Sequence, residues 1–109
     1  PLAHQFIFDD GVIDVVISKG LPIQITKSNE SMGLAQVAIR MIFFEDIDVQ
    51  RLEIIQRLNG ELQPLHSGEY SLDDVWSGIF VLPIQSELIF ILNGKNVLQR
   101  ALDEQFDER

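Results

Sequence analysis

The side chains that most often do chemistry are few in this chain and far apart. It has no cysteine and only two histidines, His4 and His66, so neither thiolate nor clustered-imidazole metal sites have enough ligands. The carboxylates of Asp9, Asp10 and Asp14 could hold Mg²⁺ through oxygen atoms, but their spacing does not fit the twelve-residue calcium loop. Turn formation before a glycine explains Asp10 without a metal. We therefore expect no metal site.

Catalysis would have to depend on His66, which precedes Ser67 and is followed by Asp73 and Asp74. A catalytic triad requires each side chain to orient the next within hydrogen-bond reach, and Ser67 lacks the Gly-x-Ser-x-Gly turn that presents a nucleophile. Glycine-rich nucleotide-binding motifs are also missing from the sequence. We expect a protein that is not an enzyme and has no cofactor. A small hydrolase or isomerase using Asp and His66 is the alternative.

The acidic balance limits the partners that the chain can attract. It has 17 Asp and Glu against 8 Lys and Arg, a net charge of −9. This charge repels nucleic-acid phosphates and anionic lipid headgroups, so we expect neither nucleic acid nor a membrane as partner. It attracts a protein with a basic surface. An acidic mimic of nucleic acid remains an alternative. The cysteine-free composition and the lack of a secretory signal in residues 1–5 favour the cytoplasm.

Two aromatic residues that occur once each lie within an acidic stretch and indicate a partner-binding surface. Aromatic anchors with charges around them are common at protein interfaces. Acidic residues also crowd the end of the chain, where they would oppose the dipole of a terminal helix and therefore suggest a function. The candidate partner-binding residues are Glu69, Tyr70, Asp73, Asp74, Trp76, Asp103, Glu104, Asp107 and Glu108.

The first half of the chain, read as part of one domain over residues 1–109, is dominated by strand patterns. Apolar runs at 5–9 and 12–18 flank an Asp-Gly pair, which predicts a hairpin. Alternation predicts a third strand at 21–27. Residues 34–44 alternate as a strand does, although their composition also suits a buried helix. We favour the strand.

The second half of the chain shows helical spacing in two places. Apolar residues recur every three or four positions over 48–59, which predicts a helix. A second helix is expected to begin at Asn96, which suits a helix cap. Five consecutive apolar residues at 88–92 predict a buried strand.

The stretch from Tyr70 to Pro83 is ambiguous. A capping pattern at Ser71 favours a helical turn at 71–77 that gives way to a strand at about 78–82. Alternatively, residues 78–84 pair with 87–92 as a hairpin. We favour the helical turn.

These elements together predict an α+β fold. It comprises an antiparallel meander of about four N-terminal strands, a middle helix, one or two further strands and a C-terminal helix. Over residues 12–108 this order and the acidic charge resemble the small acidic secretion chaperones of the type III class, and acidic immunity or inhibitor proteins fit the same observations. Both imply a small acidic protein-binding module. Strands 34–44 and 88–92 offer more apolar surface than a small core covers, so we also expect a homodimer.

Overall fold

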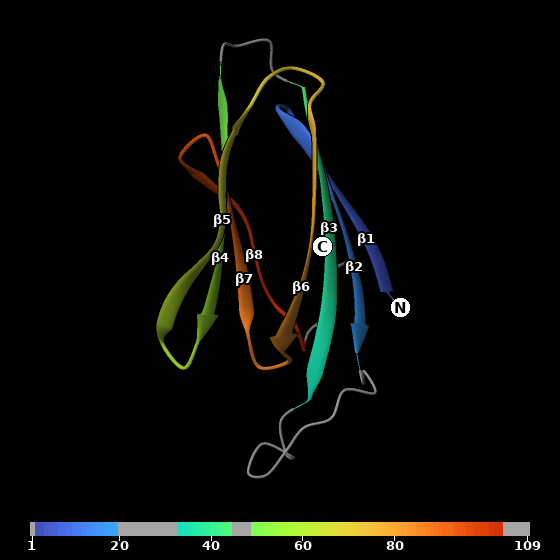
Figure 1. The fold of residues 1–109 in the computed structure, drawn as a ribbon, viewed down its shortest axis with the longest axis vertical. Coiled ribbons are helices and arrows are strands. Elements are labelled where there is room, and N and C mark those ends of the chain that lie inside the picture. The colour runs from blue at the N-terminus through green and yellow to red at the C-terminus, as the bar shows by residue number, and fades with distance from the viewer. Residues whose placement is uncertain (1, 20–32, 45–48, 104–109) are drawn as a thin grey trace.

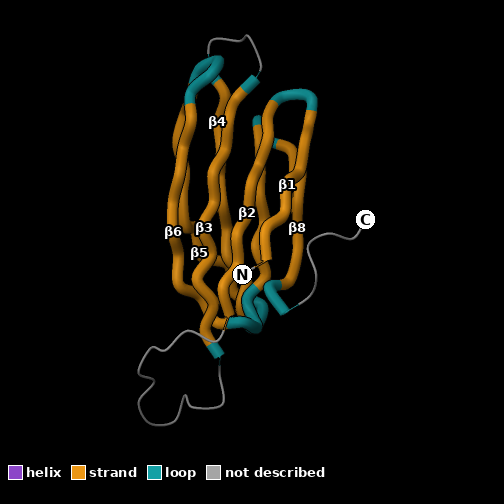
Figure 2. The backbone as a smooth tube through the Cα atoms, turned by 90° about the vertical axis from the view of Figure 1, so that its right-hand side faces the viewer, coloured by secondary structure: helices purple, strands orange, loops and turns teal. Residues whose placement is uncertain are grey.

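Two antiparallel sheets form the residues that the computed structural model describes, which are 2–19, 33–44 and 49–103. Sheet A holds, in spatial order, β1 (Leu2–Phe8), β2 (Gly11–Lys19), β3 (Leu34–Phe43) and β6 (Val75–Pro83). Sheet B holds, in spatial order, β5 (Glu61–Tyr70), β4 (Gln50–Leu58), β7 (Glu87–Leu92) and β8 (Lys95–Ala101). The sheets face each other as a sandwich (Figure 1), and Figure 2 shows the same layers after a quarter turn.

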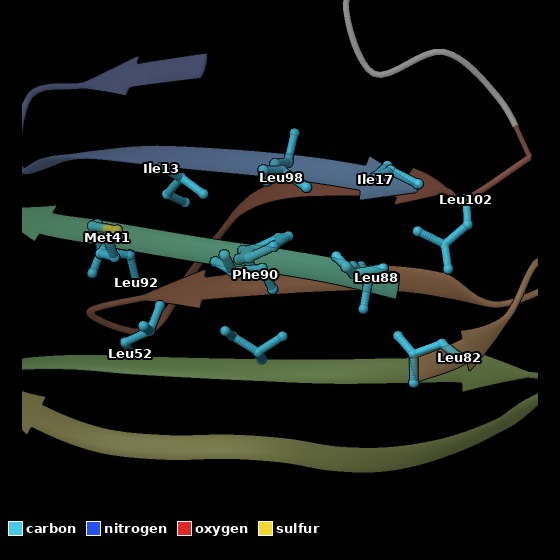
Figure 3. Packing of buried hydrophobic residues seen from close by; sticks show 14 of the residues in the cluster. Ile13, Ile17, Met41, Leu52, Leu82, Leu88, Phe90, Leu92, Leu98 and Leu102 are labelled. Carbon is cyan, nitrogen blue, oxygen red and sulfur yellow. The ribbon is translucent and has the colours of Figure 1, made fainter. Parts of the chain in front are cut away.

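The core lies between the two sheets and is built from alternate residues of the central strands. Successive side chains of a strand point to opposite faces, so an apolar residue at every second position gives one apolar face. These side chains come from both sheets and meet in the middle (Figure 3). The fully buried members include Ile13, Val15, Val37, Met41, Phe43, Leu52, Ile54, Leu88 and Leu92.

Two Asn-Gly pairs form the hairpin turns of sheet B. Asn59 and Gly60 have φ values of 52° and 79° between β4 and β5, and Asn93 and Gly94 have 53° and 82° between β7 and β8. Two-residue hairpin turns that match the twist of the strands need positive φ at both positions, which asparagine and glycine tolerate best. Local sequence therefore determines where both hairpins reverse.

The predicted α+β fold is wrong, because the described residues form strands and no helix. No segment of this part of the chain is a helix of the length and apolarity needed to cross a membrane. The middle helix predicted at 48–59 is strand β4, whose inward side chains are Gln50, Leu52, Ile54 and Gln56. Its alternation is regular, but two of the four inward positions are glutamines, so counting apolar residues favoured helical spacing.

The predicted C-terminal helix is strand β8, and a β-bulge explains the error. Phe90 pairs with Leu98 while Ile91 pairs with Asn96, so Val97 is an extra residue in β8. The bulge leaves Val97 half-buried and Leu98 buried next to it, which breaks the alternation that marks a strand. The resemblance to type III secretion chaperones depended on these helices and is withdrawn with them.

The helical turn predicted at 71–77 is also wrong, because a tight turn leads from β5 directly into β6. The alternative hairpin of 78–84 with 87–92 fails as well: β6 pairs with β3, and β7 pairs with β4 in the other sheet.

The strand predictions fared better. The hairpin between the runs at 5–9 and 12–18 is confirmed, but its turn residues are Asp9 and Asp10, and Gly11 of β2 already pairs with Phe8 of β1. The strands at 34–44 and 88–92 are also confirmed. The strand predicted at 21–27 lies outside the described residues.

A buried polar pair joins the β6–β7 connection to β4. Gln56 Nε2 donates a hydrogen bond to Ser86 Oγ at 2.8 Å, and both residues are buried. Backbone bonds from Ser86 to Pro83 and from Leu102 to Ser86 hold the same connection. The pair therefore satisfies a polar side chain that faces the core of the sandwich.

We expect Ser86→Ala to reduce the free energy of unfolding by about 1–3 kcal/mol, because it leaves a buried amide of Gln56 without its acceptor. Urea denaturation measures this change. Ser77→Ala, at an exposed position of β6, is the matched control and should change stability by less than about 0.5 kcal/mol. Equal effects of the two substitutions would contradict this role of Ser86.

Candidate functional site

The aromatic residues predicted to bind a partner, Tyr70 and Trp76, lie at one side of the sandwich and join its two sheets. Tyr70 ends β5 and stacks on Phe43 of β3 with ring centroids 4.6 Å apart. Trp76 of β6 stacks on His66 of β5 at 4.2 Å. Both contacts join sheet A to sheet B, at the side where β5 and β6 are the edge strands. The Trp76 ring lies over Gly78, where an added Cβ would come within 2.6 Å of it.

His66 is held among rings and not among carboxylates. Its Nε2 lies 2.6 Å from the Tyr70 hydroxyl, and its ring lies between Tyr70 and Trp76. Burial lowers the pKa of His66, so its neutral form is favoured. Burial and then the nearby Asp74 carboxylate raise the pKa of Tyr70. His66 therefore acts here as a packing and hydrogen-bonding group, and the hydrolase alternative gains no support from its surroundings.

The described acidic residues of the predicted binding surface lie in different local settings. Asp73, with φ of 70°, and Asp74 lie in the β5–β6 turn, where the Ser71 N–H donates to Asp74 Oδ2 at 2.8 Å. Glu69 points outward from sheet B and forms an ion pair with Arg51 at 3.3 Å.

Of the four acidic residues predicted near the end of the chain, the structure describes one. Asp103 is exposed after β8, while Glu104, Asp107 and Glu108 lie outside the described residues. No group of three or more metal-binding side chains occurs in residues 2–19, 33–44 and 49–103.

A different surface, which sequence reasoning missed, is the outer face of sheet A. It consists of the side chains of sheet A that point away from sheet B. Several are large, apolar and exposed, with 71% of Ile7 and 66% of Ile79 accessible. The described members are Ala3, Gln5, Ile7, Val12, Asp14, Val16, Ser18, Leu34, Gln36, Ala38, Arg40, Ile42, Val75, Ser77, Ile79, Val81 and Pro83.

Strand register arranges these side chains in rows that cross the sheet. The middle row is polar and consists of Gln5, Asp14, Arg40 and Ser77. Gln5 Nε2 donates to Asp14 Oδ1 at 2.7 Å, and Arg40 pairs with Asp14 Oδ2 at 3.4 Å. Apolar rows lie on both sides of it, one with Ile7, Val12, Ile42 and Val75 and the other with Ala3, Val16, Ala38 and Ile79.

A shallow hollow of about 690 Å³ lies over the middle of this face. Ala3, Ala38 and Ser77 contribute small side chains to its lining, and Ile79 and Arg40 border it as long ones. The outer face of sheet A thus has a shallow hollow next to the exposed side chain of Ile79.

The outer face of sheet B carries more charged side chains, although Ile55, Ile89 and Ile91 also point outward from it. Its outward side chains include the ion pairs of Arg51 with Glu53 and Glu69, and of Arg57 with Glu87 at 2.9 Å. A sandwich sheet with one solvated face carries such polar residues there. An apolar face of several rows on the other sheet therefore indicates an interaction surface.

Comparison with known protein families, with curated proteins and with solved structures finds no match to this chain. The signal for the outer face of sheet A was nevertheless present in the sequence. Strand β2 has apolar residues at odd and at even positions. Ile13, Val15 and Ile17 face the core, while Val12 and Val16 face outward. A strand that is apolar on both faces requires cover on both faces.

We expect stability to fall as the pH decreases below the ordinary His66 pKa of 6.5, through the interval down to its lower folded value. In that interval the unfolded chain binds the proton that folded His66 resists, so protonation favours unfolding. His66→Phe keeps a ring against Trp76 and removes the titration. Its free energy of unfolding, measured by urea denaturation from about pH 7 to 5.5, should show a smaller pH slope. An unchanged slope would contradict the prediction.

Proposed function

We propose that the chain is a small, non-catalytic protein-binding module that binds through the outer face of sheet A. Its partner on this proposal is a protein surface that is flat, apolar and almost uncharged. The observation that carries the proposal is the pair of exposed apolar rows on either side of the row with Asp14 and Arg40. The cytoplasmic location expected from composition belongs to the same proposal.

The physical chemistry of this face suits a protein partner. Removing apolar surface from water contributes roughly 25 cal/mol per Å², and the buried centre of an interface is depleted in charge. Among the described members of this face, Asp14 and Arg40 are the only charged side chains, and they have opposite sign. The apolar rows supply affinity, and the polar row supplies orientation.

The expected basic partner fits another place in the fold. A neutral face does not attract a basic protein, so the charge argument applies to Asp73 and Asp74 in the β5–β6 turn. Those two residues remain a separate prediction.

The nucleic-acid mimic needs carboxylates spaced like phosphates on one face. On sheet B, Glu53, Glu69 and Glu87 are each paired with arginine, and on sheet A Asp14 pairs with Arg40. The three arginines Arg40, Arg51 and Arg57 offset part of the charge of these four carboxylates, which weakens the case for a mimic.

Affinity capture with matched variants tests the proposal. The wild-type chain, Ile79→Glu and Leu62→Glu are immobilised and exposed to an extract of the source organism. Leu62 is an apolar residue of β5 with 59% accessible, so it controls for adding a carboxylate to an exposed strand. We expect proteins held by the wild type to be held by Leu62→Glu and reduced at least about tenfold by Ile79→Glu, because a buried, unpaired carboxylate costs several kcal/mol.

Equal capture by Ile79→Glu and the wild type would contradict the proposed surface. An Asp73→Asn/Asp74→Asn variant tests the β5–β6 turn in the same experiment. Asparagine tolerates positive φ and its amide oxygen can accept the Ser71 N–H, so the fold should be preserved. A basic protein lost only from this double variant would bind at the turn, whereas one lost only from Ile79→Glu would bind at the outer face of sheet A.

A further inference from the structure

We infer that the protein surface bound by the outer face of sheet A is the same face of a second copy of the chain. The two copies would be related by a two-fold axis that runs parallel to the strands, between β2 and β3. This inference depends on the proposed function, since it names the partner of the proposed surface. Charge, shape and area each support it.

Under this symmetry, the two charged side chains of one copy are complementary to those of the other copy. Asp14 and Arg40 are directly opposite each other on the adjacent strands β2 and β3. A two-fold axis between these strands lays β2 of one copy over β3 of the other, so Asp14 of each copy meets Arg40 of its mate. An in-plane axis across the strands, along the row of Asp14 and Arg40, would instead bring Asp14 onto Asp14. Symmetry therefore selects the arrangement with two attractive pairs.

Net charge makes this face suitable for self-association. Each copy carries −9, so most of its surfaces repel a second copy. The outer face of sheet A holds one acid and one base among its described residues, and its local charge is zero. Two copies can approach there without opposing like charges.

The side chains are also complementary in size. The same axis lays β1 over β6, so Ala3 meets Ile79 of the mate and Ile7 meets Val75. Between the central strands, Val16 meets Ala38. In the row of Ala3, Val16, Ala38 and Ile79 each larger side chain thus opposes an alanine, and the exposed Ile79 lies over the hollow that Ala3 helps to line. Aligned packing of two sheets, with their usual rotation of about 30°, preserves these pairings near the axis.

The size of the face sets the expected strength. Four strands about 4.8 Å apart and about eight residues long, at roughly 3.4 Å per residue, cover on the order of 500 Å² per copy. Stable interfaces commonly bury about 800 Å² per partner. The face therefore lies at the small end of the range, where weak and transient complexes are found, and we expect a reversible dimer with a dissociation constant on the order of micromolar.

Charge-reversal variants in a mixing experiment test this arrangement. Asp14→Arg gives a face with two positive charges, and Arg40→Asp gives one with two negative charges. Sedimentation equilibrium from about 1 to 200 μM brackets the expected dissociation constant. We expect the wild type to dimerise and each variant alone to associate at least about tenfold more weakly. An equimolar mixture of the two variants should recover dimers, because every Arg then meets an Asp of the other chain.

The control reverses an ion pair of the opposite face. Arg57→Asp/Glu87→Arg, on the outer face of sheet B, should dimerise as the wild type does. Asp14 and Arg40 form an exposed pair, so their reversal should leave the fold intact, as checked by circular dichroism.

Two results would overturn the inference. The first is a monomeric wild type across the whole concentration range. The second is a wild-type dimer with no recovery in the mixed variants. If the wild type is monomeric but Ile79→Glu still loses a captured protein, the inference fails while the proposed function stands.

Discussion

Alternation of side chains along β2 and β3 is the constraint on which the structure depends. In these central strands of sheet A, one set of alternate residues packs against sheet B and includes Ile13, Val15 and Met41. The other set includes Val12, Val16 and Ile42, and points away from sheet B. A sandwich covers only one face of each sheet. The same residue choice that builds the core therefore leaves a second apolar face to be covered.

The two sheets meet this constraint in different ways. Sheet B has arginine–glutamate pairs on its outer face, and exposed pairs of this kind contribute little to stability but keep the face in water. Sheet A has the single pair of Asp14 and Arg40 within apolar rows. At the side where β5 and β6 are the edge strands, His66 stacks on Trp76 and joins the two sheets, so these aromatic residues contribute to the packing of the sandwich. The surfaces proposed for binding are the outer face of sheet A and the β5–β6 turn.

Local signals in the sequence predicted the parts of the fold that local chemistry controls. The hairpin of β1 and β2 and the strand at 88–92 were predicted correctly because turn-forming residues lie next to clear apolar runs. Strand β4 was missed because glutamines occupy two of its inward positions, 50 and 56, and β8 because the bulge at Val97 breaks its period. In both places a helix was predicted where the structure has a strand, and these two errors made the predicted fold class wrong.

The candidate site was harder to predict than the fold, because it depends on register between distant segments. Asp14 and Arg40 are 26 residues apart in the chain and become neighbours only when β2 pairs with β3. Ile79 reaches the same face through the pairing of β6 with β3. Sequence reasoning could see that Tyr70 and Trp76 are unusual, but their place between the sheets follows from tertiary packing.

Solvent access to the methyl groups of the outer face of sheet A tests the central claim most directly. Methyl NMR with a soluble paramagnetic agent compares Val16, Ile42 and Ile79 with the exposed Leu62 of sheet B at several protein concentrations. The account predicts that the sheet A methyls become protected as concentration rises through the micromolar range, while Leu62 stays accessible. Sheet A methyls that remain as accessible as Leu62 at every concentration would contradict it.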